Sequence, residues 1–232
     1  MLFRSHRLRV PVVTRGAGTG LSGGANCPEG AVVLSTRRLD RIVGVDATDR
    51  VMVVQPGVVT AQVRAEAARH GLLYPPDPGS VESCSIGGNV ATNAGGMCCV
   101  KYGVTADFVL GLEVVLADGR VVRTGRRTVK GVAGYDLTHL FVGSEGTLGV
   151  ITEITLRLVP AAARATTLLA CFPDLASAGE AVRAILDTGI TPSALELLDR
   201  TTIAAIEAMS PMGFDTRSEE HTSELQSPMY LV

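Results

Sequence analysis

The chain lacks the features that would place it in a membrane. Its 232 residues contain no apolar run that approaches the roughly 20 residues a membrane-spanning helix requires. The first six residues also lack the long apolar core of a secretory signal peptide. We therefore expect a soluble, cytoplasmic protein with no transmembrane segment.

An excess of charge of one sign is absent as well. The 21 basic and 23 acidic side chains leave a net charge of −2. Proteins that bind nucleic acid or anionic membranes usually present a strong positive field, so the charge argues against nucleic acid as a partner. With 46% apolar residues, the chain is long enough for one large or two small globular domains.

Cysteine and histidine are too few and too scattered to indicate a disulfide framework or a metal site. The five cysteines are odd in number and include an adjacent pair, a spacing that fits neither disulfide pairing nor zinc ligation. The four histidines do not form a pair at metal-ligand spacing. We predict ordinary thiols in a reducing compartment, and no metal site.

Glycine, by contrast, is abundant, with 26 residues, and it forms three dense clusters. The first, residues 16–24, follows an apolar strand predicted at 10–14 and includes the hydroxyls of Thr19 and Ser22. Its backbone N–H groups can all point at one anion, with Arg15 at the mouth. We predict a pyrophosphate cradle here, and a flexible surface turn is the alternative.

The first cluster also contains the spacing G-x-G-x-x-G, from Gly18 to Gly23, with Asp40 about where a nicotinamide-binding fold has its ribose-binding acid. In that fold the glycine turn opens a helix. Here residues 24–30 contain proline and glycine and lead to another strand. We therefore reject a nicotinamide-binding turn.

The second cluster, residues 84–96, follows three prolines that fix an extended path. It consists of small residues with Asn, Thr and Ser side chains, a surface that can accept a large planar polar ring system. Close backbone packing is the alternative. The third cluster, residues 143–149, comes directly before a β-branched strand, and its backbone can lie along the edge of a ligand. Alone, this cluster is a weak signal.

Hydrophobic periodicity predicts mixed helices and strands. Beyond the strand at 10–14, we expect strands at 31–35, 51–54 and 150–159. A helix is expected at 60–70, with Thr60 as its N-cap and Gly71 at its C-terminal end. Residues 111–125 predict a β-hairpin, with Asp118-Gly119 in a type I′ turn.

A second domain is predicted after Pro160, where the glycine clusters end. Strands are expected at 166–172 and 193–198, and helices at 175–188 and 201–209. Residues 217–227 have no apolar period and resemble the in-frame translation of a common sequencing adapter. We therefore expect residues 217–232 to be non-native and leave them out of the fold prediction, with a natural polar tail as the alternative.

Together and in this order, the three clusters resemble the PCMH-type FAD-binding domain of vanillyl-alcohol oxidase-type flavoproteins. The sequence is most similar to the subfamily of glycolate oxidase flavin subunits, D-lactate dehydrogenases and D-2-hydroxyglutarate dehydrogenases. The resemblance is dense over residues 10–160 and loose over 161–212. It implies an α+β fold, with FAD between two α+β subdomains over residues 1–160 and a truncated α+β substrate (cap) domain over 161–216.

By this resemblance each cluster holds a different part of FAD. The residues expected at the pyrophosphate are Arg15, Gly16, Ala17, Gly18, Thr19, Gly20, Ser22 and Gly23. Those expected along the flavin and its ribityl chain are Asp77, Ser80, Ser85, Gly87, Gly88, Thr92, Asn93 and Gly95. Those expected on the adenosine side are Glu145, Gly149 and Ile151. Relatives with covalently attached flavin often carry His near the place of Thr19, so we expect noncovalent FAD.

The resemblance implies an FAD-dependent oxidoreductase that oxidises a 2-hydroxy acid, such as glycolate, D-lactate or D-2-hydroxyglutarate, to the 2-oxo acid by hydride transfer to FAD. Two alternatives remain. One is a flavoprotein of the same fold with another substrate, such as an enolpyruvyl sugar nucleotide or an alkyl-glycerone phosphate. The other is a nonenzymatic FAD-binding subunit of a multi-subunit oxidase. Partner subunits or an electron acceptor are compatible with each.

No catalytic residue is predicted. Lys130 and Tyr135 precede the third cluster, but surface charge and a packed aromatic ring explain them better. The family usually has a further strand and helix before residue 10, and many relatives have a later His-rich, metal-binding segment. We therefore expect a fragment that is inactive by itself.

Overall fold

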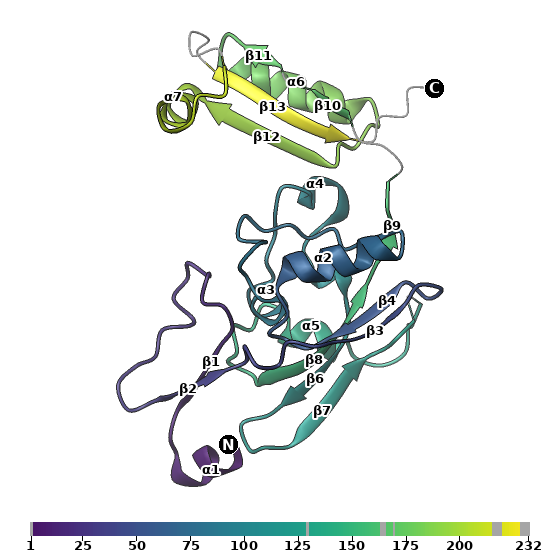
Figure 1. The fold of residues 1–232 in the computed structure, drawn as a ribbon. Helices are drawn as coiled ribbons and strands as arrows, with labels where there is room; N and C mark the ends of the chain where they lie inside the picture. Colours follow the sequence, from purple (N-terminus) through teal and green to yellow (C-terminus); the bar gives the residue numbers. More distant parts are fainter. Residues whose placement is uncertain (1, 129, 163–165, 169, 215–219, 228–232) are drawn as a thin grey trace. The chain divides into compact units, whose positions relative to one another are not determined.

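The protein is described by a computed structural model that covers residues 2–128, 130–162, 166–168, 170–214 and 220–227 (Figure 1). The chain divides into two compact units, which are described separately here. Unit 1 comprises Met1–Gly96 and Gly103–Ala161, and unit 2 comprises Met97–Tyr102 and Ala162–Val232. Over the described ranges, every helix is too short or too polar to cross a bilayer.

An antiparallel five-stranded sheet forms the centre of unit 1, with the strand order β3-β4-β8-β6-β7. Its strands are β3 (Ile42–Asp46), β4 (Val51–Val54), β6 (Val109–Val115), β7 (Val121–Gly125) and β8 (Val150–Arg157). The strands expected at 51–54 and 150–159 are confirmed. Strand β3 was not predicted, because Gly44 interrupts its apolar run and Val43 is exposed at the sheet edge.

Short helices complete the core of unit 1, and Figure 1 shows α2 and α3 over one face of the sheet. They are α1 (Leu2–Leu8), α2 (Thr60–Arg69), α3 (Ile86–Thr92), the 3₁₀ helix η1 (Thr105–Phe108) and α5 (Leu137–Phe141). Val63 and Ala67 of α2 and Ile86 and Val90 of α3 are fully buried. Burial of these apolar faces stabilises helices that would be too short to persist alone.

Helix α2 has the predicted extent but a different N-cap. Val59 takes the cap position, and its N–H donates to Gln62 Oε1 at 3.2 Å. Thr60 is fully buried, and its hydroxyl accepts hydrogen bonds from Asn89 Nδ2 at 2.6 Å and from Cys84 Sγ at 3.4 Å. The predicted Thr60 cap is therefore wrong, because the hydroxyl satisfies polar groups in the core instead.

Two small sheets lie beside the main one. Strands β1 (Val12–Arg15) and β2 (Val32–Ser35) pair in parallel, and β5 (Leu72–Leu73) pairs antiparallel with β9 (Val159–Pro160). The connection between β1 and β2 contains no helix, although every residue of it is described. This confirms that the G-x-G-x-x-G spacing does not open a nicotinamide-binding turn.

The hairpin of β6 and β7 is confirmed, but its turn differs from the predicted type I′. Gly119 has a φ of 91°, whereas Asp118 is not among the residues with positive φ. The Gly119 N–H donates to Leu116 O at 2.9 Å, and the Leu116 N–H donates to Arg120 O at 2.8 Å. A type I turn followed by a left-handed glycine explains this pattern, because only the third loop residue then needs a positive φ.

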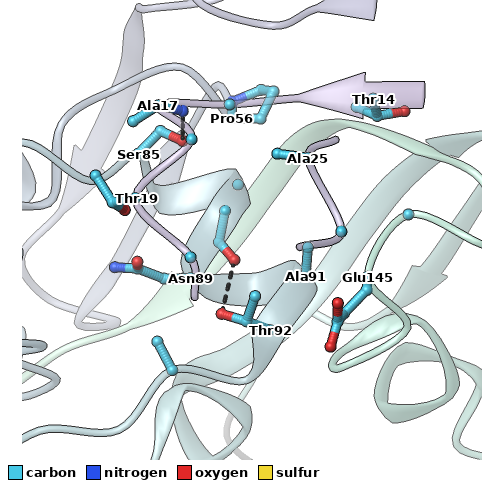
Figure 2. Close-up of a pocket in the computed structure, with 18 of the residues that line it drawn as sticks. Thr14, Ala17, Thr19, Ala25, Pro56, Ser85, Asn89, Ala91, Thr92 and Glu145 are labelled. Carbon is cyan, nitrogen blue, oxygen red and sulfur yellow. Dashed lines mark hydrogen bonds between the residues drawn. The ribbon is translucent and has the colours of Figure 1, made fainter. Parts of the chain in front are cut away.

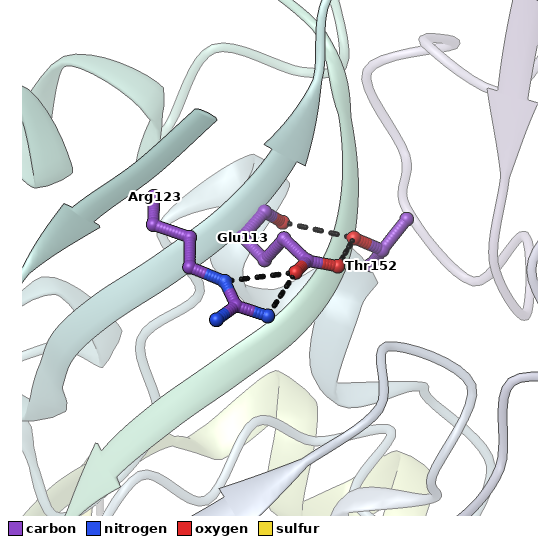
Figure 3. Close-up of polar contacts among 3 residues, drawn as sticks. All are labelled: Glu113, Arg123 and Thr152. Carbon is purple, nitrogen blue, oxygen red and sulfur yellow. Dashed lines mark hydrogen bonds and ion pairs between the residues drawn. The ribbon is translucent and has the colours of Figure 1, made fainter. Parts of the chain in front are cut away.

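A polar network at Glu113 of β6 reaches from β8 to the edge strand β7 (Figure 3). Its carboxylate accepts from Arg123 Nη2 of β7 at 2.6 Å and from Thr152 Oγ1 of β8 at 2.8 Å. The Arg123 hydrogen bond, followed by that of Thr152, holds the pKa of the Glu113 carboxyl below its usual range. The network thus ties three neighbouring strands together by their side chains.

Unit 2 is built around antiparallel pairing to β13 (Glu220–Ser227). Its other elements are α4 (Cys99–Tyr102), β10 (Thr166–Leu168), β11 (Cys171–Phe172), α6 (Leu175–Asp187), β12 (Ala194–Asp199) and α7 (Arg200–Met209). The predicted helices are confirmed, and Asp174 and Asp199 cap them by accepting from Ser177 N and Thr202 N. The strand expected at 166–172 is divided into β10 and β11.

Strand β13 lies where the sequence predicts no regular element. Its backbone pairs with β10 and β11 on one edge and with β12 on the other. Strand pairing is a backbone property, so a segment without an apolar period can still fill a gap between strands. Residues 217–219 and 228–232 of the expected tail lie outside the described residues.

Candidate cofactor site

The three glycine clusters meet around one cavity of about 500 Å³ in unit 1 (Figure 2). Such a volume is within the range of pockets that hold cofactors and other small molecules. Most of the residues predicted from the sequence line it. They are Gly16, Ala17, Gly18, Thr19, Gly20, Ser22, Ser80, Ser85, Gly87, Gly88, Thr92, Asn93, Gly95, Glu145, Gly149 and Ile151.

The first cluster forms the loop that leaves β1, and it packs closely against α3. The Ala17 N–H donates to Ser85 Oγ at 3.2 Å, a contact drawn in Figure 2. A Cβ on Gly16 would overlap the same Ser85 hydroxyl, so only glycine allows this approach. Among the described residues, the N–H groups from Gly18 to Ala25 have no acceptor in the protein. They remain available to an anion.

The second cluster folds into α3, whose small residues bring its backbone to the cavity wall. The Gly87 N–H donates to Pro56 O at 2.8 Å, and a Cβ on Gly87 would overlap the Pro56 ring. The Thr92 hydroxyl donates to Gly88 O at 3.0 Å, as Figure 2 shows. Both alternatives posed by the sequence therefore apply here, because the same small residues permit close packing and line the cavity.

The C-terminal end of α3 turns at Asn93, which adopts a left-handed conformation with a φ of 49°. Its Oδ1 accepts from Ala106 N at 2.8 Å, which links the cavity wall to η1. The third cluster attaches to the same end of the helix. Gly143 N donates to Val90 O at 2.9 Å, and Glu145 N donates to Ala91 O at 2.8 Å.

Among the described residues that line the cavity, Glu145 is the one with a charged side chain. Its backbone also has a positive φ, 51°, and its Oε2 accepts from Ser22 Oγ at 3.3 Å. The carboxylate therefore joins the third cluster to the first. Because a carboxylate repels phosphate, an anion in this cavity must be held by backbone N–H groups away from Glu145.

The structure does not bring three predicted residues into the lining: Arg15, Gly23 and Asp77. The guanidinium of Arg15 lies against Gly18, with Nη2 3.0 Å from where a Cβ would stand. Asp77 is buried, 4.0 Å from Arg64 Nη1, with Gly96 packed against its backbone. A sequence pattern cannot distinguish residues that lie next to the lining in the chain from residues that form it.

Other lining residues were not predicted from the sequence. They are Thr14, Leu21, Gly24, Ala25, Thr36, Pro56, Pro78, Asn89, Ala91, Ala94 and Gly146. Most lie within or beside the three clusters, so a prediction of whole segments would have included them. Thr36 and Pro56 carry no local signal, because they reach the cavity only through the packing of β2 and of the turn after β4.

The cavity fits FAD on structural grounds. The glycines of the first loop and of α3 bring backbone to the cavity surface, which suits a ligand approached closely by backbone. Free N–H groups of the first loop suit a pyrophosphate, and the hydroxyl and amide side chains of the second cluster suit a polar ring and its polyol chain.

Comparison with known proteins gives the family. Residues 4–125 match the FAD binding domain, and residues 161–224 match the C-terminal domain of FAD linked oxidases. The chain is 46% identical over 211 residues to glycolate oxidase subunit GlcD of Bacillus subtilis, covering 91% of this chain and 45% of that protein. It is 44% identical over 211 residues to D-lactate dehydrogenase of Archaeoglobus fulgidus, covering 91% and 47%.

Solved structures agree on the fold. Two structures of alkyldihydroxyacetonephosphate synthase have TM-scores of 0.84 and 0.83 at 22% and 24% identity, covering 97% and 98% of this chain and 44% and 47% of theirs. This likeness shows the fold alone, and it confirms the PCMH-type α+β fold expected from the sequence. The chain spans less than half the length of these curated relatives. It belongs to the FAD binding domain family of FAD-linked oxidases, and FAD is its cofactor.

Proposed function

We propose that this chain is the cofactor-binding part of an oxidoreductase that oxidises a 2-hydroxy acid, such as glycolate or D-lactate, to the 2-oxo acid. One observation carries the proposal: three glycine clusters, distant in sequence, line one cavity with backbone and small polar side chains. The substrate class is supported by relatives named glycolate oxidase subunit GlcD and D-lactate dehydrogenase.

The residues of this chain would bind and orient the cofactor. The N–H groups of the first loop would hold the pyrophosphate, and α3 with Asn93 would support the flavin. Glu145, which accepts a hydrogen bond from Ser22 of the first loop, would hold the adenosine side. FAD, when bound, supplies the chemistry by accepting two electrons from the hydroxyl-bearing carbon of the substrate.

The cavity lining offers no second group for acid–base work. Glu145 is its one ionisable side chain among the described residues, and neither Lys nor Arg is present there to clamp a substrate carboxylate. We therefore propose that the groups that hold the substrate lie elsewhere in the full-length protein, and we assign no catalytic residue in this cavity.

We further propose that FAD is bound without a covalent bond. Thr19 stands in the first loop, and the described lining contains neither histidine nor cysteine. Purified protein should be yellow, and acid precipitation should release the colour into the supernatant. Flavin that stays in the pellet would show a covalent link, and failure to take up FAD would contradict the cavity assignment.

The substrate is tested by anaerobic mixing of the FAD-loaded protein with glycolate, D-lactate or D-2-hydroxyglutarate. We expect loss of the flavin absorbance with a full-length relative and no loss with this chain, because positioning of the substrate contributes several kcal/mol to catalysis. Bleaching of this chain at a comparable rate would place the substrate-binding groups within it. No bleaching of the full-length protein by any of the three would favour another substrate class.

A nonenzymatic FAD-binding subunit is the second candidate. It is favoured by the same shortage of ionisable groups in the cavity. Co-purification with a second polypeptide that restores bleaching by a hydroxy acid would distinguish it from a fragment of a single-chain enzyme. We also propose a cytoplasmic location, supported by the five cysteines, whose odd number and spacing fit no disulfide framework, with a small-molecule substrate and an electron acceptor as partners.

A further inference from the structure

His139 of α5 lies outside the cavity lining, and each of its two ring nitrogens lies within hydrogen-bond distance of an acceptor. Nδ1 is 2.6 Å from Asp136 Oδ2, and Nε2 is 3.0 Å from Ala106 O. Asp136 is in turn fixed as the N-cap of α5, where its Oδ1 accepts from His139 N at 3.1 Å. The imidazole therefore bridges the start of α5 and the 3₁₀ helix η1.

The residue that His139 contacts on η1 is the one that holds the cavity wall. Ala106 donates its N–H to Asn93 Oδ1 at 2.8 Å, and Asn93 lines the cavity at the end of α3. The next residue, Ala94, is held by η1 as well, since its carbonyl accepts from Thr105 N at 3.1 Å and from Thr105 Oγ1 at 2.7 Å. A shift of η1 would therefore move Asn93 and Ala94 together.

The backbone of Asn93 is in the left-handed region, with a φ of 49°. Asn adopts this conformation more readily than most residues, and contacts with neighbouring segments fix the direction of its side chain. The Ala106 hydrogen bond is one such contact. Gly143 also packs next to this turn, since a Cβ on Gly143 would lie 3.5 Å from Asn93 Cβ.

We propose that His139 is a positioning residue of the cofactor cavity, which holds η1 through Ala106 and thereby fixes the side chain of Asn93. The proposal rests on the proposed function, because it takes this cavity as the FAD site. His139 is not among the residues that line the cavity, so it acts on FAD binding only through Ala106.

The test compares two conservative variants. The Gln side chain in His139→Gln can place a donor near the position of Nε2, while the shorter Asn side chain in His139→Asn can replace only Nδ1. We expect His139→Asn to weaken FAD binding roughly three- to tenfold, the value of one lost hydrogen bond, and His139→Gln to bind like the wild type. His70→Asn is the matched control, because His70 is not among the lining residues and its Nε2 lies 3.3 Å from Glu66 Oε1 within the region of α2.

A double-mutant cycle with Asn93→Gly tests the route. Glycine tolerates the left-handed backbone and removes the Oδ1 acceptor. If both residues act through Ala106, the double variant His139→Asn/Asn93→Gly should bind FAD no more weakly than Asn93→Gly alone. The proposal would be overturned if the losses in FAD affinity multiplied in the double variant. It would also be overturned if His139→Asn bound FAD like the wild type, or if His139→Gln and His139→Asn lost the same affinity.

Amide hydrogen exchange of Ala106 separates this proposal from the assignment of the cavity to FAD. In the protein without FAD, exchange at Ala106 N should be faster in His139→Asn than in the wild type and unchanged in His139→Gln. If the wild type does not bind FAD, the proposed function fails, and the exchange rates alone decide whether His139 positions η1. Unchanged exchange in His139→Asn would overturn the positioning role.

Discussion

At the scale of single residues, the glycines of the cavity differ in what they are needed for. Gly16 and Gly87 are needed for space, since a Cβ on either would overlap Ser85 or Pro56. Gly18 is needed for conformation, with a φ of 78°. These two requirements predict different responses to substitution.

Gly87→Ala should lower the free energy of unfolding by about 1–3 kcal/mol, because the added methyl group forces α3 away from the turn after β4. FAD affinity should fall with it, since α3 forms a wall of the cavity. Gly79→Ala is the control, because a Cβ there meets open space at an ordinary φ. Urea unfolding and FAD titration measure both quantities, and equal midpoints for the two variants would refute the close contact.

Gly18→Val and Gly30→Val separate strain from ligand contact. Both glycines have a φ of 78°, so each substitution should lower stability by about 1–2 kcal/mol. Only Gly18 lines the cavity and faces Arg15, whereas a Cβ on Gly30 meets nothing. FAD titration should therefore show a large loss for Gly18→Val alone. A similar loss for Gly30→Val would mean that loop flexibility, not contact, controls binding.

Thr60→Val tests the buried hydroxyl that links α2 to α3. The substitution keeps the shape but leaves Asn89 Nδ2 without the acceptor that now lies 2.6 Å away. We expect a loss of about 1–3 kcal/mol in the free energy of unfolding, and near wild-type stability for Thr60→Ser, which keeps the hydroxyl. Thermal unfolding of the two variants provides the comparison. Equal stability of Thr60→Val and the wild type would show that the hydroxyl is dispensable.

At the scale of elements, side chains that cross strands decide how the main sheet responds to acid. The pKa of Glu113 is lowered in the folded protein, chiefly by its hydrogen bond with Arg123. A carboxyl with a depressed folded pKa contributes stability above its unfolded pKa, about 4.3 for Glu, and loses that contribution as pH falls through the folded value.

Glu113→Gln should therefore be less stable than the wild type at neutral pH and equally stable in acid. Because Arg123 is 76% exposed, the difference at neutral pH should be only about 0.5 kcal/mol. Urea midpoints measured from about pH 7 down to about pH 3 give the profile, with Arg120→Gln at the exposed turn as a comparison. A difference that persists in acid would mean that packing, not charge, accounts for the effect.

At the scale of the whole molecule, the division into two units predicts selective stabilisation by the cofactor. All described lining residues of the FAD cavity belong to unit 1. A hundredfold excess of FAD over its Kd should stabilise that unit by about 2.7 kcal/mol and leave unit 2 unchanged. Hydrogen exchange with mass spectrometry can follow both units at once. Equal protection of unit 2 would show that the units unfold together.

The sequence by itself determined the parts of this protein that depend on local chemistry. Clusters of glycine, a β-branched strand before the first loop and the apolar periods of helices can be recognised without tertiary contacts, because turns, strands and helices leave local patterns in the sequence. The rejected nicotinamide turn and the helices α2, α6 and α7 were predicted on this basis, whereas the FAD-binding family came from the resemblance that the three glycine clusters carry.

Only the tertiary structure decided which side chains reach the cavity. Asp77 and Arg15 lie within or beside the predicted clusters yet are not among the lining residues, while Pro56 and Thr36 line the cavity without any local sequence signal. The Thr60 side chain does not cap α2 as expected but accepts a buried hydrogen bond from Asn89. Strand β13 pairs with β12 although its sequence has no apolar pattern. In each case the outcome depends on contacts between segments far apart in sequence, and such contacts leave no local periodicity to read.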